Sequence, residues 1–233
     1  MKTNQCPSTF FKVVISFTLS LILILNACMI FAQDIALANA KIPTHEYLSK
    51  MESKMSNFEK GMDRLESGEP GEAIAYFNRA AKENPANAVI CDKLGQAYAK
   101  TKEYRKAIEH FDKAIALDNT NPVFYYDKAL AEIYLDKIEK SISDCDRAIL
   151  LDPAYAEAYL VRGISKAVLG EIEGSMQDLR LAISLKNDYG EAYYNIGLNF
   201  YELRDDANAR FNFKRASELG YNIQDLENYL DKE

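Results

Sequence analysis

The sequence has few of the residues that interrupt helices. Of its 233 residues only ten are glycine and six are proline. The chain is instead rich in alanine, leucine, glutamate and lysine, which favour helices. With 48% hydrophobic and 27% charged residues it can form a core, which excludes a low-complexity or disordered chain. We therefore predict an all-α fold.

Residues that carry catalytic or metal chemistry are also scarce. The chain has two histidines, His45 and His110, and neither has a cysteine, histidine or acidic partner at metal-ligand spacing. We expect His110 on an exposed helix position. No nucleophile motif, phosphate-binding loop or dinucleotide fingerprint occurs, and acid pairs such as Asp205 with Asp206, or Asp144 with Asp146, are typical of solvated surfaces. We predict no enzyme activity, no cofactor and no metal.

Positive charge is in deficit as well. The 28 lysines and arginines face 35 aspartates and glutamates, so the formal charge is -7. Removal of residues 1–32 would delete Lys2 and Lys12 and no acid, leaving 26 minus 35, or -9. Such a chain has no broad positive field for phosphate backbones, and we do not expect a nucleic-acid partner.

The N-terminal segment 1–32 has the pattern of an export signal. Lys2 and Lys12 precede an apolar run from Val13 to Leu25 that only three hydroxyl residues interrupt. A segment of this kind directs export and does not belong to the folded body. We predict residues 1–32 to be a signal peptide or membrane anchor.

The fate of this signal stays open between four outcomes. The chain can be cleaved after Ala32 or after Ala40, or it can carry a lipid on Cys28, which follows a lipobox-like Leu-Asn-Ala. The stretch from Val13 to Ala32 is also long enough to span a membrane uncleaved. Each outcome predicts an exported body that is periplasmic, secreted or anchored to the envelope, with the membrane reached only through this signal.

Small and bulky residues recur through the rest of the chain with a period of 34 residues. One small series starts at Gly61 and continues at Gly95, Ala129, Gly163 and Gly197. Two further small series start at Ala73 and Ala80. A bulkier series consists of Phe77, Phe111, Cys145, Leu179 and Phe213.

Apolar spacing within one period predicts two helices. Cys91, Leu94, Gly95 and Tyr98 lie at i, i+3, i+4 and i+7, the spacing of one helix face. The same spacing returns from residue 104 onward, after a three-residue turn that makes the two helices antiparallel. Small residues let the paired helices approach closely.

This pattern resembles the tetratricopeptide repeat family, whose 34-residue signature includes Leu-Gly, tyrosine, alanine, an aromatic residue and alanine. Residues 88–121 carry it as Leu94-Gly95, Tyr98, Ala107, Phe111 and Ala114. The resemblance implies a right-handed α-solenoid of five helix-turn-helix repeats in residues 54–223. The repeats are bounded at 54–87, 88–121, 122–155, 156–189 and 190–223.

The segments around the repeats follow from their patterns. Residues 33–53 are predicted to be a linker with a helical extension, and residues 224–233 a short amphipathic helix that caps the last repeat. Pro85 and Pro153 should end the second helices of repeats one and three. The two cysteines outside the signal, Cys91 and Cys145, could form a disulfide bond or be small buried residues, and their repeat positions favour burial.

The resemblance also implies a binding surface. In this family the first helix of each repeat lines a concave groove, with its second, fifth, ninth, twelfth and thirteenth positions facing the ligand. Carried over to this chain, these positions predict a partner-binding groove that contains Phe58, Met62, Asp92, Gln96, Tyr126, Leu130, Leu160, Ile164, Tyr194, Leu198 and Tyr201. The basic clamp by which some members hold a peptide carboxylate is missing. The residues could instead pack within the solenoid or against a second copy.

Two functions fit this prediction. The first is a non-catalytic scaffold that binds a peptide or an amphipathic helix of another protein in its groove, in the cell envelope. The second is a structural subunit of an envelope complex that self-associates through the same surface into a homo-oligomer. The repeat determines the shape of the molecule, and the groove side chains determine the partner.

Overall fold

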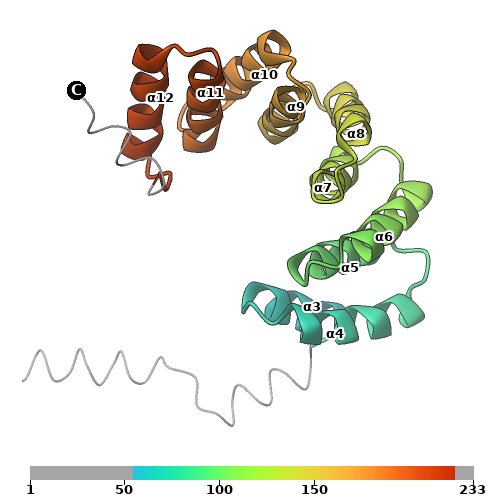
Figure 1. The fold of residues 1–233 in the computed structure, drawn as a ribbon. Coiled ribbons are helices and arrows are strands. Elements are labelled where there is room, and N and C mark those ends of the chain that lie inside the picture. Colours follow the sequence, from blue (N-terminus) through green and yellow to red (C-terminus); the bar gives the residue numbers. More distant parts are fainter. Residues whose placement is uncertain (1–54, 224–233) are drawn as a thin grey trace, which may run out of the picture. The chain divides into compact units, whose positions relative to one another are not determined.

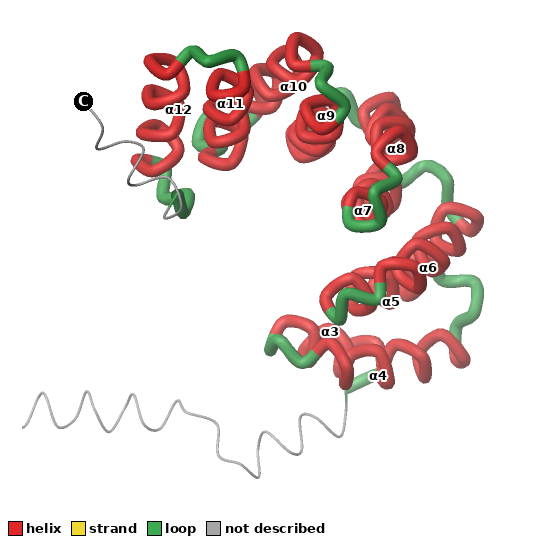
Figure 2. Tube along the Cα trace, in the orientation of Figure 1, coloured by secondary structure: helices red, strands yellow, loops and turns green. Residues whose placement is uncertain are grey.

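The computed structural model describes residues 55–223, and within that range every regular element is an α-helix (Figures 1 and 2). The helices are α3 (Asn57–Glu66), α4 (Pro70–Glu83), α5 (Ala88–Lys100), α6 (Tyr104–Leu117), α7 (Pro122–Ile133), α8 (Ile138–Leu151), α9 (Ala156–Val168), α10 (Ile172–Leu185), α11 (Gly190–Glu202) and α12 (Asp206–Glu218). The predicted all-α fold of paired helices is confirmed. The predicted signal with Cys28, the linker and the capping helix lie outside the described residues.

The helices form successive antiparallel pairs. We call α3, α5, α7, α9 and α11 the A helices and α4, α6, α8, α10 and α12 the B helices. Each A helix packs on the B helix that follows it, and each B helix packs on the next A helix. Consecutive A helices also contact one another. In Figure 1, α5, α7 and α9 lie on the inner side of the curve that the helices of residues 55–223 form.

The small residues of the first repeating series lie where each A helix crosses its B helix, as predicted. Gly61, Gly95, Ala129, Gly163 and Gly197 are all buried. A Cβ atom built on Gly95 would lie only 2.5 Å from Cε1 of Phe111. The ring of the bulky residue therefore occupies the space that a side chain would need.

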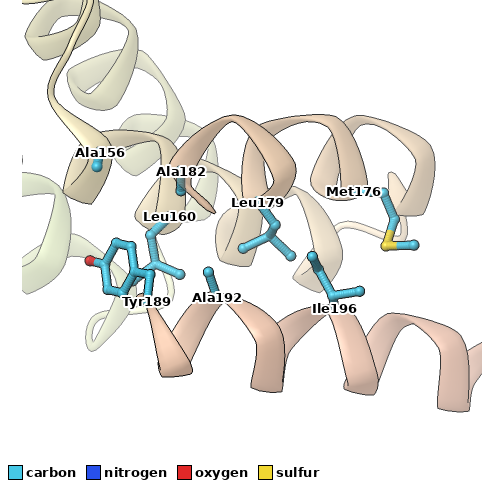
Figure 3. Close-up of a cluster of buried hydrophobic side chains, with 8 residues drawn as sticks. All are labelled: Ala156, Leu160, Met176, Leu179, Ala182, Tyr189, Ala192 and Ile196. Atoms are coloured by element: carbon cyan, nitrogen blue, oxygen red, sulfur yellow. The ribbon is translucent and has the colours of Figure 1, made fainter. Parts of the chain in front are cut away.

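The core continues from one pair to the next. Figure 3 shows one part of it, where Leu160 of α9, Leu179 of α10 and Ile196 of α11 meet with five neighbouring side chains. The two cysteines of the repeats, Cys91 and Cys145, are buried and unpaired, as their repeat positions predicted. Burial of apolar side chains between pairs is what stabilises a solenoid of this kind.

Helix ends follow the local sequence. Ser56, Asn87 and Asn121 cap α3, α5 and α7 with side-chain oxygens that accept backbone N–H groups. The B helices α4 and α8 end at Glu83 and Leu151, two positions before a proline, as predicted.

The turn inside each pair has a conformation that the sequence did not reveal. One residue in each turn adopts positive φ, and these residues recur at the step of the repeat: Gly68, Lys102, Asp136, Gly170 and Arg204. In the second turn, the N–H of Glu103 donates to the carbonyl of Tyr98 at 2.9 Å, which closes the end of α5. All five turns therefore share a left-handed position, although only two of them carry glycine there.

Candidate functional site

The predicted groove residues differ in how far they are accessible. Asp92 and Leu160 are only 2% and 3% exposed, and Leu160 belongs to the core of Figure 3. Tyr201 is 41% exposed. The remaining eight, which are Phe58, Met62, Gln96, Tyr126, Leu130, Ile164, Tyr194 and Leu198, are half-buried. Asp92 and Leu160 are therefore buried, and neither belongs to the accessible surface.

Several half-buried residues serve the core and the surface together. The ring centroid of Phe58 lies 5.8 Å from that of Phe77, and Tyr194 lies 5.7 Å from Phe213 and 5.1 Å from Tyr221. Each aromatic side chain therefore packs on the bulky residue of its own repeat, and part of it stays accessible.

We use the name inner surface for the accessible side chains of the A helices and of the turns that lead into them. It consists of Phe58, Met62, Gln96, Tyr126, Asp127, Leu130, Tyr155, Glu157, Ile164, Glu191, Tyr194, Leu198 and Tyr201. The carboxylates and Tyr155 were not among the predicted groove residues. Asp127 lies at the sixth position of its repeat, which the family pattern does not turn toward the ligand. Glu157 and Glu191 lie at the second position, which the family pattern does turn toward the ligand, but these two residues were not carried over into the prediction.

Two carboxyl groups meet between α5 and α7. The Nε2 group of Gln96 donates to Oδ2 of Asp92 at 3.0 Å and to Oδ2 of Asp127 at 2.6 Å. The nearest cation is Lys93, whose Nζ lies 3.6 Å from Oδ2 of Asp92 and 2.9 Å from Oε1 of Gln96. The second oxygen of Asp92, Oδ1, is buried without a hydrogen-bond donor.

Burial dominates the electrostatics of this pair. It raises the pKa of Asp92 to about 7, and the negative charge of Asp127 adds to the increase. Burial also raises the pKa of Asp127. One amide and one lysine are therefore too little to hold both carboxylates charged near neutral pH.

A cavity of about 450 Å³ opens beside this pair, where α5, α6 and α7 come together. Gln96 and Asp127 line it on one side, and Leu130, Tyr104 and Tyr134 supply apolar and aromatic surface. The rings of Tyr104 and Tyr134 are stacked with centroids 4.5 Å apart. The cavity thus combines a carboxyl group with an apolar and aromatic wall that can contact the carbon chain or the ring of a bound side chain.

Tyrosines and carboxylates continue along the A helices beyond this cavity. The rings of Tyr126 and Tyr155 have centroids 5.2 Å apart. Burial raises the pKa of the Tyr126 phenol, and the charges of Asp127 and Glu157 add to it, which places these groups close together. Burial likewise raises the pKa of Glu191.

Lys186 shows how a cation binds to this kind of surface. Its Nζ lies 4.4 Å from the ring centroid of Tyr189 and 3.4 Å from Oε1 of Glu157. A tyrosine face and a carboxylate thus hold one ammonium group together.

A second set of charges links neighbouring repeats. Lys128 of α7 pairs with Asp112 at 2.9 Å and with Asp144 at 3.2 Å. At the equivalent position of the next repeat, Arg162 of α9 pairs with Asp146 and Asp178, each at 2.6 Å. We assign these ion pairs a structural role. The recurrence of a cation and two acids at the step of the repeat could have revealed them in the sequence.

In repeat three a third acid, Glu132, lies beside the ion pair of Lys128. Glu132 is 2% exposed, and its Oε2 atom has no hydrogen-bond donor. Burial raises the pKa of Glu132 to about 7, and the charge of Asp144 contributes to the increase. In repeat four the equivalent position is Lys166, which pairs with Asp178 at 2.8 Å.

One histidine, His110, lies within residues 55–223. His110 is half-buried and stacks on Tyr98 with ring centroids 5.3 Å apart, so the expectation of an exposed residue was wrong. Burial lowers the pKa of His110. Within residues 55–223 no group of three or more histidine, cysteine or acidic side chains is arranged to hold a metal ion. In the same range no helix is both long and apolar enough to cross a membrane.

Comparisons with known proteins agree with this architecture. Two family models described as tetratricopeptide repeat match residues 64–133 and 123–155. No curated protein matches the sequence. Among solved structures, one of MamA shares 29% identity over 69% of this chain and 94% of its own, with a TM-score of 0.61. A tetratricopeptide protein of Thermus thermophilus shares 23% identity over 74% and 95%, with a TM-score of 0.64.

One similar structure contains a ligand. It is described as the first tetratricopeptide domain of Spaghetti (RPAP3) bound to the HSP90 peptide SRMEEVD, and it shares 28% identity over 51% of this chain and 94% of its own, with a TM-score of 0.50. The helix pairs and the register of small residues agree with the two matching family models. Residues 64–155 are therefore similar to tetratricopeptide repeats.

Proposed function

We propose that this chain is an exported, non-catalytic scaffold that binds a segment of another protein on its inner surface. The observation that carries the proposal is the row of tyrosine, leucine and carboxylate side chains on consecutive A helices. Tyr126, Leu130 and Tyr194 keep part of their surface accessible although they also pack on the core. Tyrosine combines contact area with a polar end, and such residues are favoured at protein interfaces.

Peptide binding by a similar structure supports this proposal. The Spaghetti domain, which resembles half of this chain, is bound to a peptide. Export is proposed from the sequence of residues 1–32 and places the partner in the periplasm, at the cell surface or in the envelope.

Photocrosslinking in the native cell tests the proposal. A photoreactive residue at Tyr126 or Tyr194 should give one reproducible adduct, which mass spectrometry identifies. The matched control is Tyr76, a half-buried tyrosine of the B helix α4. Adducts from Tyr76 alone, or from none of the three positions, would overturn the proposal.

A self-associating subunit is the second candidate. Tyr134, Val168 and Leu203 are well exposed, with Tyr134 at 67%, and each ends an A helix or lies in the turn that follows it. Exposed apolar residues can serve an interface between copies. Light scattering separates the two candidates, because the scaffold is expected to be monomeric and the subunit should form oligomers whose size increases with concentration.

A further inference from the structure

The inner surface combines acidic groups with aromatic faces. Asp92 and Asp127 lie between α5 and α7, and Glu157 and Glu191 lie at the starts of α9 and α11. Tyr126 and Tyr155 lie near two of these acids, since the charges of Asp127 and Glu157 raise the pKa of both phenols. A carboxylate next to a tyrosine face is the environment that lysine and arginine side chains prefer.

These acids have fewer cationic neighbours than they could accept. Lys93 lies 3.6 Å from Asp92, and Lys186 lies 3.4 Å from Glu157. Asp92 is 2% exposed and keeps one oxygen without a donor, although its carboxyl group is hydrogen bonded to the Gln96 amide that lines the 450 Å³ cavity. This oxygen is buried and Asp92 does not line the cavity, so a cation of the partner would act on the pair through Asp127, which does line it.

We propose that the inner surface recognises a basic, extended segment of the partner protein, with lysine or arginine side chains that bind to Asp127, beside the buried Asp92, and farther along to Glu157 and Glu191. This inference rests on the proposed scaffold function and specifies the chemistry of the partner. The aliphatic stem of the first basic side chain lies along Leu130 and Tyr134 in the cavity. Its charged end meets Asp127, and the segment continues over the tyrosines of α7 and α9.

Two features of the chain itself support this choice of partner. Lys186 already binds between Tyr189 and Glu157 as we propose for a basic residue of the partner. The formal charge of -7 also favours encounter with a basic segment. The cavity contains one opposing charge, because Lys100 lies at its rim, but this residue is exposed and can turn toward solvent.

Three labelled peptides of equal length test the inference on the purified full chain. In these peptides serine alternates with lysine, with glutamate or with glutamine, and fluorescence anisotropy measures their binding. We expect the lysine peptide to bind more tightly than the other two. Sodium chloride should weaken this binding, because ionic contacts are screened. Equal or tighter binding of the glutamate or glutamine peptide would overturn the inference.

Variants distinguish recognition from general attraction to an acidic protein. Asp127→Asn keeps an oxygen that can accept from Gln96 but removes the charge, and should weaken lysine-peptide binding about 3- to 10-fold. Glu191→Gln serves as a second inner variant. The matched control is Glu139→Gln, which removes the same charge from an exposed position of the B helix α8 and should change binding little. Equal effects of Asp127→Asn, Glu191→Gln and Glu139→Gln would contradict the inference.

The crosslinked partner separates failure of this inference from failure of the scaffold function. If Tyr126 or Tyr194 captures a protein whose adduct maps to an acidic or neutral segment, the scaffold function stands and the basic segment is wrong. If neither inner position captures a partner, both proposals fail.

Discussion

Ala129 packs against Cys145 where α7 crosses α8, and neither side chain is reached by solvent. In three other repeats the equivalent positions pair a glycine with a phenylalanine, as in Gly95 with Phe111. Repeat three has therefore exchanged a small and a large residue for two of intermediate size. The two positions keep the same separation along the chain in every repeat, and they share a limited volume between the paired helices.

This shared volume predicts coupling between the two positions. Cys145→Phe should be destabilising by about 1–3 kcal/mol, because the ring would meet the methyl group of Ala129. The added change Ala129→Gly should recover part of that loss, and denaturant unfolding of both single variants and the double variant measures the coupling. We expect an interaction of about 1 kcal/mol. Strictly additive effects would show that the two residues do not share the space.

Gly95→Ala should destabilise the chain although alanine is the better helix former. The new methyl group would lie 2.5 Å from Cε1 of Phe111, and the resulting strain should cost about 1–3 kcal/mol. Gly71→Ala is the control, because Gly71 lies in α4 with no atom within 4 Å of its added Cβ. Denaturant unfolding should find the control unchanged or more stable. A Gly95→Ala protein as stable as the wild type would contradict the close approach.

Lys102→Gly should stabilise the chain. Lys102 has φ of 63°, a left-handed conformation that costs a residue with a Cβ about 1 kcal/mol and glycine much less. Chemical or thermal unfolding should show a gain of this size. Lys113→Gly, at an exposed position inside α6, should instead lose about 1 kcal/mol. A loss at both positions would mean that the turn conformation is not strained.

The buried acids predict a stability that depends on pH. The pKa of Glu132 rises from 4.5 to about 7, so the folded protein binds this proton more tightly than the unfolded chain does. The resulting contribution to the free energy of unfolding is complete below about pH 4 and is lost as the pH rises to about 7, with a slope of at most about 1.4 kcal/mol per pH unit. Asp92 acts in the same direction, from 3.8 to about 7.

Denaturant unfolding across this pH range tests the prediction. Glu132→Gln should be increasingly more stable than the wild type as the pH rises, because glutamine carries no proton that must be lost. Glu139→Gln, on the exposed surface of α8, should follow the wild type at every pH. If the stability of Glu132→Gln also followed that of the wild type at every pH, Glu132 would already be charged in the folded protein.

The sequence was sufficient to predict the packing of the repeats. Gly163 and Gly197 recur at the step that brings helix pairs together, so their burial followed from their spacing alone. The positive φ of Lys102 and Asp136 could not be predicted in this way, because their side chains gave no sign of the glycine-like conformation that the turn requires. Backbone geometry common to all repeats determined it.

Less of the candidate site could be predicted from the sequence. Leu160 was assigned to the groove from the position that Tyr126 also occupies, but it is drawn into the core between α9 and α11. The pairing of Asp92 with Asp127 depends on the approach of two A helices from different repeats, and a pattern within one repeat does not contain it. Contacts between repeats therefore account for most of what was missed.

Amide hydrogen exchange on the full chain, with and without the protein captured at Tyr126, tests most directly whether the A helices form the binding surface. We predict slower exchange in α5, α7 and α9 when the partner is bound, and little change in α6, α8 and α10. Protection confined to the B helices would contradict the account.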